Sequence, residues 1–113
     1  MELEVTQLGD GLTCARLTGR MDSPGVDKIE IRFSAGVVAP ARNAVVDLSG
    51  VEFLASMGIR LFIASARALS QKGAKMVLFG ASEMVQSVLE TVAIDQIIPV
   101  VATQQQAVDK LQA

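Results

Sequence analysis

The sequence contains no histidine, tryptophan or tyrosine, and only one cysteine, Cys14, among its 113 residues. Without histidine the chain cannot form a histidine-ligated metal site or the Ser-His and Cys-His pairs that activate nucleophiles. A lone cysteine cannot form a disulfide within the chain, which favours a reducing compartment and predicts a small core residue. We therefore predict that the protein is not an enzyme and has no catalytic residue, metal or other cofactor.

Positive charge and aromatic surface are also scarce. The formal net charge is −2 and aromatic residues make up 4% of the chain. Nucleic-acid-binding proteins use basic patches and aromatic stacking platforms, so we expect no direct contact with nucleic acid. The opening segment "MELEVTQLGDG" lacks the basic start and apolar core of a signal peptide. No apolar run approaches the ~18 residues of a membrane span, so the sequence predicts a cytoplasmic protein without a membrane span.

The composition is that of a packed domain. Half of the residues are hydrophobic and 19% are charged, which separates the chain from disordered proteins. Its length suits one domain, residues 1–113, with a modest core. Apolar surface in excess of that core suggests a protein partner, either another protein or a second copy of this chain in a homodimer.

Segments of strand type and helix type alternate along the chain. The expected strands are 3–8 and 12–19, joined by a tight Gly9-Asp10-Gly11 turn, then 43–50, 75–80 and 96–101. We expect Asp47 and Ser49 to interrupt the third strand before "VEFL", and Pro99 to place the last strand at a sheet edge. Helices are expected to start at Ser23, before Pro24, and after Ser56, Ser82 and Thr103. The order β-β-α-β-α-β-α-β-α predicts an α/β fold with a mixed, mostly parallel sheet of about five strands and about four helices.

Ser56 is the most informative polar residue. It separates an apolar strand from a helix, which makes it a natural N-cap whose removal costs about 1 kcal/mol. The same position suits an anion, because the macrodipole and the free N–H groups of a helix favour negative charge at its N-terminus. A phosphate on this hydroxyl would add about −1.5 to −2 charges. Ser56 is thus either a cap or a switch that alters binding without unfolding the domain.

Asp22 and Asp47 are two carboxylates near predicted strand ends, and each has both a structural and a functional interpretation. Asp22 either caps the first helix or faces the surface around Ser56. Asp47 either accepts backbone N–H groups in a turn or contributes to a ligand crevice. Two carboxylates without a phosphate-binding loop make a weak case for catalysis.

The helix after Ser56 has an apolar stripe. The spacing of Ile59, Phe62 and Ile63 directs these side chains to the core. By the same geometry Met57, Arg60, Leu61 and Ala64 point outward. An exposed leucine beside a methionine, next to Ser56, predicts a protein-binding surface.

Three stretches carry a family resemblance: "LTGRMDS", "VVDLSGVEFLASMGIRLFIAS" and "GAKMVLFGASEMVQSVLETVAIDQII". Together they resemble the STAS domain, and most closely the stand-alone bacterial anti-sigma factor antagonists. The similarity covers nearly the whole chain. Family members commonly read D-L-S, a short spacer, F and a hydrophobic residue, then D-S-S-G before a helix.

The resemblance implies a partner-switching phosphoprotein in the regulation of transcription. The unphosphorylated family member binds a serine kinase of the histidine-kinase-like ATPase type, which doubles as an anti-sigma factor, and so releases the sigma factor. The kinase ends the interaction by phosphorylating a serine at the strand-to-helix junction, and a PP2C-type phosphatase restores it. By position Ser56 matches that serine, Gly58 the motif glycine and Asp22 the acidic residue after the second strand. The implied partner-binding residues are Asp22, Ser56, Met57, Gly58, Arg60 and Leu61.

The sequence departs from the family pattern on both sides of Ser56. Ala55 stands where the family has aspartate, Met57 where it has a second serine, and Arg60 where a small residue is common. Ala55 removes a carboxylate that could orient the hydroxyl, while Met57 adds an adaptable apolar contact. Two alternatives follow: a non-switching STAS scaffold subunit of a lipid-transport or stress-sensing complex, or a nucleotide-binding STAS domain that uses Asp22, Asp47 and Ser56.

Overall fold

A five-stranded sheet with the strand order β1-β2-β3-β4-β5 organises the protein. The computed structural model describes residues 1–9 and 11–112. Strands β1 (Glu2–Gln7) and β2 (Leu12–Met21) form an antiparallel hairpin, whose predicted turn residue Asp10 lies outside the described residues. Strands β3 (Asn43–Leu54), β4 (Met76–Phe79) and β5 (Val100–Val101) all run parallel to β2. The prediction of a mixed, mostly parallel sheet is confirmed.

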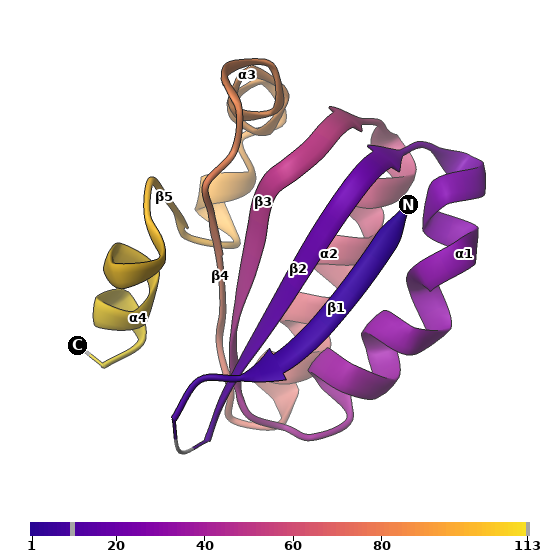
Figure 1. Cartoon of the computed structure of the whole chain (residues 1–113). Coiled ribbons are helices and arrows are strands. Elements are labelled where there is room, and N and C mark those ends of the chain that lie inside the picture. The colour runs from indigo at the N-terminus through magenta and orange to yellow at the C-terminus, as the bar shows by residue number, and fades with distance from the viewer. Residues whose placement is uncertain (10, 113) are drawn as a thin grey trace.

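Helices cover the two faces of the sheet unequally. α1 (Ser23–Phe33), continued by the π-helix η1 (Ser34–Val38), and α2 (Ser56–Gln71) lie side by side on one face (Figure 1). α3 (Glu83–Thr91) follows β4, and the short 3₁₀ helix η2 (Ile94–Gln96) leads to β5. α4 (Gln104–Gln112) packs on β3 and β4 from the opposite face (Figure 1). The predicted order of strands and helices is therefore confirmed.

The main core lies between the sheet and the α1–α2 layer. The rings of Phe33 on α1 and Phe62 on α2 meet there at a tilted angle, with their centroids 6.4 Å apart. A second, smaller core lies under α4 and contains Cys14, Val45, Val77, Phe79 and Ala107. The short α4 leaves the outer face of β1 and β2 open, and polar side chains occupy that surface.

Strand β3 corrects one sequence expectation. Asp47 and Ser49 do not interrupt it, since β3 continues through both to Leu54. The Asp47 carboxylate accepts a hydrogen bond from the Ser49 backbone N–H at 2.9 Å and pairs with Arg16 Nε on β2 at 3.3 Å. The local backbone role predicted for Asp47 is thus confirmed, but it lies within a strand, at a point where the pairing of β3 with β2 shifts register.

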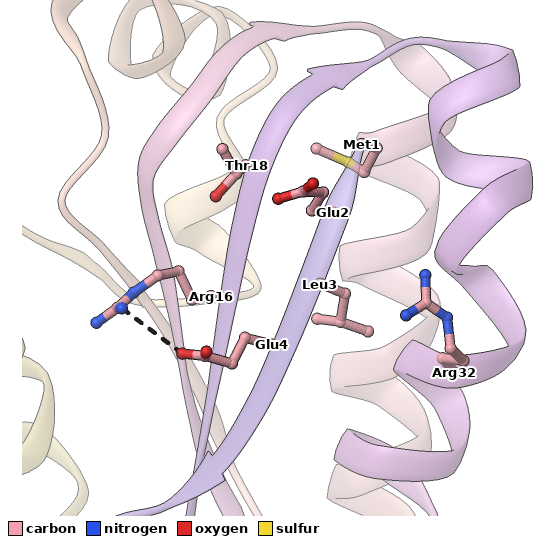
Figure 2. A pocket seen from close by; sticks show the side chains of 7 residues that line it. All are labelled: Met1, Glu2, Leu3, Glu4, Arg16, Thr18 and Arg32. Atoms are coloured by element: carbon pink, nitrogen blue, oxygen red, sulfur yellow. Dashed lines mark ion pairs between the residues drawn. The ribbon is translucent and has the colours of Figure 1, made fainter.

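The exposed edge of the sheet is protected by charge. A shallow hollow of about 420 Å³ lies beside β1 (Figure 2). On one side of the strand Glu4 pairs with Arg16 at 3.6 Å, and Arg32 of α1 lies on the other side (Figure 2). Charged side chains along an edge strand discourage pairing with other chains. We therefore interpret the charged side chains of this hollow as protection of the β1 edge against pairing with another chain.

Cys14 is expected to be chemically silent in the folded protein. Its side chain is buried in the smaller core, and burial, reinforced by the charge of Asp47, raises the pKa of the thiol. Because the thiolate is the reactive form, Ellman's reagent at pH 8 should label the native protein at least about tenfold more slowly than the protein in 6 M guanidinium. Equal rates would contradict this assignment.

Candidate functional site

The strand-to-helix junctions after β2 and β3 lie beside each other. Met21 and Leu54, the last residues of these parallel strands, are register partners, and the Ala55 N–H donates to the Met21 carbonyl oxygen at 3.0 Å. The loop that carries Asp22 and the junction that carries Ser56 therefore share one edge of the sheet. In parallel α/β sheets this carboxyl edge is where binding sites form.

Ser56 is the first residue of α2 and not its N-cap, which corrects the capping interpretation. Ala55 holds the cap position with an extended backbone and provides no side-chain cap hydrogen bond. The Ala55 methyl group cannot accept a hydrogen bond, so this side chain leaves the N–H groups in the first turn of α2 without a partner. The Ser56 side chain is exposed, and the first turn contains no acidic residue. The hydroxyl is thus displayed at a helix end that favours an anion.

Gly58 brings α2 close to the strand ends. It is buried, and a Cβ atom at this position would lie 2.6 Å from Leu54 Cδ1 and 3.1 Å from Met21 Cβ. A larger residue would have to displace the buried side chains of Leu54 and Met21 or move the first turn of α2 away from the strand ends. Gly58 therefore has a structural role in placing Ser56; it is buried and, being glycine, has no side chain to offer a partner.

Asp22 caps α1 beside the Ser56 junction. Its Oδ1 accepts a hydrogen bond from the Gly25 N–H at 2.9 Å, and its Oδ2 lies 3.3 Å from Arg20 Nε. The Gly25 hydrogen bond, with a further contribution from Arg20, holds the pKa of Asp22 below its usual value. The structure thus confirms the capping alternative for Asp22, and places the carboxylate at the same sheet edge as Ser56.

Arg20 is a residue of this edge that the sequence did not single out. Its guanidinium lies over the ring of Phe53, 4.4 Å from the ring centroid, and pairs with Asp22. Residues 20 and 53 are register partners on β2 and β3. The alternation of β2 places Arg20 on the open face, but only the strand register reveals that an aromatic ring lies beside it.

Leu61 is buried, which corrects the prediction that it lies exposed beside Met57. Only 6% of it is accessible, and it belongs to the main core. The spacing rule assumed that α2 contacts the sheet alone, whereas α2 also packs against α1. A helix with two neighbours buries a wider arc. Leu61 is therefore accessible to a partner only at its edge.

The other candidate residues on α2 have the burial that the sequence predicted, except that Met57 is half-buried. Phe62 is fully buried, and Ile59 and Ile63 are partly buried against the core. Arg60 is exposed, and its Nη1 lies 4.0 Å from the half-buried sulfur of Met57. Ser56, Met57 and Arg60 thus form a continuous accessible surface at the start of α2.

The crevice required for a nucleotide is not assembled from the residues proposed for it. Asp47 lies in the middle of β3 and is paired with Arg16, away from the junction of Asp22 and Ser56. Across residues 1–9 and 11–112, no group of three or more acidic or cysteine side chains is arranged to hold a metal ion. None of the helices in that part of the chain is long and apolar enough to cross a membrane.

These features define a small α/β domain whose distinctive surface is a serine displayed at a helix N-terminus. The chain belongs to the STAS domain family, whose model matches residues 4–107.

Three relatives illustrate the family. BtrV of Bordetella bronchiseptica, whose name describes an anti-sigma factor antagonist, is 29% identical over 98 residues, covering 87% of this chain and 84% of BtrV. The crystal structure of an anti-sigma factor antagonist from Mycobacterium paratuberculosis has a TM-score of 0.89 at 23% identity, covering 99% and 94% of the two chains. SpoIIAA of Bacillus has been solved unphosphorylated (TM-score 0.79, 20% identity, coverage 98% and 96%) and phosphorylated (0.71, 19%, coverage 96% and 98%).

Proposed function

We propose that this protein is an anti-sigma factor antagonist that works as a phosphorylation-controlled binding switch. The observation that carries the proposal is the exposed Ser56 hydroxyl at the uncapped N-terminus of α2. The names of BtrV and SpoIIAA, and the existence of a phosphorylated form of SpoIIAA, support it. In this proposal the protein binds and is not itself an enzyme, and it acts in the cytoplasm.

The proposed cycle has two partners. Unphosphorylated protein binds a serine-kinase anti-sigma factor of the histidine-kinase-like ATPase type through Ser56, Met57, Arg60 and the neighbouring Asp22. The kinase transfers the γ-phosphoryl group of ATP to the Ser56 oxygen, which releases ADP and the hydroxyl proton. A PP2C-type phosphatase hydrolyses the phosphoserine and restores binding.

Phosphorylation would act locally. The N-terminus of α2 tolerates added negative charge, so the domain stays folded. At the interface, however, the charge meets a surface that had packed against a neutral hydroxyl, and its desolvation opposes binding. The switch thus requires no conformational change within the domain.

Phosphate incorporation tests this proposal. With the kinase and ATP, intact-protein mass spectrometry should show one phosphate on the wild type and none on Ser56→Ala. Ser23 is a matched control, because it is also an exposed serine at the first position of a helix. Ser23→Ala should accept phosphate like the wild type. If Ser56→Ala is phosphorylated as well, the site is misassigned.

The scaffold alternative rests on Ala55 and Met57, which replace polar neighbours of Ser56 with apolar groups. It predicts a stable complex with a partner and no phosphate on Ser56 in cells. The same mass spectrometry, performed on protein isolated from its native host, separates this alternative from the switch.

A further inference from the structure

Arg60 lies one helical turn after Ser56 on α2. Ser56 is the first residue of the helix, and Arg60 is four residues further along it. Side chains separated by four residues lie on the same face of a helix, with their Cβ atoms ~5–6 Å apart. Both side chains are exposed. The guanidinium and the hydroxyl therefore border the same accessible surface, and a group attached to the hydroxyl lies within reach of the guanidinium.

The side chain of Arg60 already extends toward the start of the helix. Its Nη1 lies 4.0 Å from the sulfur of Met57, the residue that directly follows Ser56. This direction agrees with the general tilt of helical side chains toward the N-terminus of their helix. The guanidinium thus lies over the first turn of α2, where Ala55 provides no cap and no acidic residue is present. A phosphate on Ser56 would meet the guanidinium without any movement of the backbone.

Arg60 has no carboxylate partner among residues 1–9 and 11–112. The ion pairs in that part of the chain belong to two other arginines and join Arg16 to Glu4 and Asp47, and Arg20 to Asp22. Glu30 of α1 lines the same hollow as Arg60 but forms no ion pair with it. In the unphosphorylated protein a free cation therefore lies beside a neutral hydroxyl.

We propose that Arg60 binds the phosphate of phosphorylated Ser56 and forms a clamp within α2. The inference rests on the proposed function and adds what the phosphate does once it is attached. A guanidinium group binds phosphate through paired N–H···O hydrogen bonds, and the helix N-terminus adds favourable partial positive charge. The clamp also gives a physical role to Arg60, which stands where a small residue is common in the family.

The clamp changes the accessible surface in two ways at once. Phosphorylation replaces the neutral hydroxyl of Ser56 with a group that carries about −1.5 to −2 charges, and it engages the cation of Arg60. The surface formed by Ser56, Met57 and Arg60 thus changes from net positive to net negative. A partner that contacts the free guanidinium in the unphosphorylated protein loses that contact when the phosphate is present.

The charges around Ser56 make the pKa of the phosphate a selective measure of the clamp. The second ionisation of phosphoserine has a pKa of about 6. Asp22 at the neighbouring strand end and Glu30 on α1 are carboxylates that would raise this pKa, and Arg20 is paired with Asp22. Arg60 and the N-terminus of α2 would lower it. Replacing Arg60 alone therefore separates its contribution from that of the helix.

The test incorporates phosphoserine at position 56 during translation, with an expanded genetic code, so that no kinase is needed. Titration by phosphorus-31 NMR should give a phosphate pKa at least about half a unit lower in the otherwise wild-type protein than in Arg60→Gln. Arg60→Lys keeps the charge without the planar fork and should lie in between. Arg67→Gln is the matched control, because it removes the same charge from an exposed position of α2 about 16 Å further along the helix. It should titrate like the wild type.

Thermal unfolding at pH 8 gives a second readout. Phosphoserine at position 56 should raise the unfolding temperature, and Arg60→Gln should reduce this increase whereas Arg67→Gln should not. Equal phosphate pKa values in the wild type and Arg60→Gln would overturn the clamp, as would an equal rise in Arg60→Gln and Arg67→Gln. The proposed function fails separately: if the kinase transfers no phosphate to Ser56 while the pKa difference is present, the switch is refuted and the contact with Arg60 stands.

Discussion

Replacing Ser56 with aspartate should reduce the affinity for the kinase anti-sigma factor by at least about 100-fold, whereas Ser56→Ala should bind within a few-fold of wild type. An unpaired charge buried at an interface costs roughly 3–5 kcal/mol, and each 1.4 kcal/mol corresponds to a factor of about ten. Alanine removes only an exposed hydroxyl, so most of the contact remains. Calorimetry with the purified kinase measures both variants.

The stability of the fold, unlike the affinity for the kinase, should not fall in Ser56→Asp. A negative charge at the first position of α2 interacts favourably with the helix macrodipole, by about 0.3–1 kcal/mol. Thermal unfolding of Ser56→Asp should therefore occur at or slightly above the wild-type temperature. Gln104→Asp places the same charge at the start of α4, on the other face of the sheet, and is the matched control, expected to retain kinase binding. Wild-type affinity in Ser56→Asp would refute the charge switch.

Gly25→Ala should be among the most destabilising conservative substitutions in the chain. A Cβ atom at position 25 would overlap the carbonyl oxygen of Arg20, which is backbone and cannot rotate away. Relief of the overlap requires α1 to move from the end of β2 and disturbs the Gly25–Asp22 hydrogen bond. Overpacking of this kind costs about 1–3 kcal/mol and occasionally more, and we expect the upper end of that range. Urea denaturation measures the loss.

Gly36→Ala is the matched control for this prediction. Gly36 is also in a helical segment, and a Cβ atom there would approach only the side chain of Val5, at 3.0 Å. That side chain lies on the edge strand and is 39% exposed, so it has room to move. The gain in helix propensity, about 1 kcal/mol, offsets the remaining crowding. Similar losses in the two variants would show that the Arg20 contact is not the cause.

Tertiary packing explains why the sequence misplaced Leu61. Periodicity identifies the face of a helix that meets one neighbour, and it correctly directed Phe62 to the core. It does not reveal a second neighbour, and α1 is that neighbour for α2.

Capping shows a similar limit. The sequence placed the start of α2 within one residue, but assigned the cap to Ser56 instead of Ala55. Capping preferences favour serine over alanine, so local chemistry alone selects the wrong residue. In the structure Ala55 occupies the cap position, where its N–H donates to the Met21 carbonyl oxygen at the end of the neighbouring strand.

The sequence by itself determined the element order, the α/β class, the parallel sheet and the position of Ser56 at a strand-to-helix junction. Those features depend on local periodicity and on glycine, proline and serine signals that act over a few residues. Only the tertiary structure decided that Asp47 remains within a strand, that Arg20 lies over Phe53, and that Leu61 is buried. These depend on contacts between residues far apart in the chain, whose side-chain geometry no local pattern encodes.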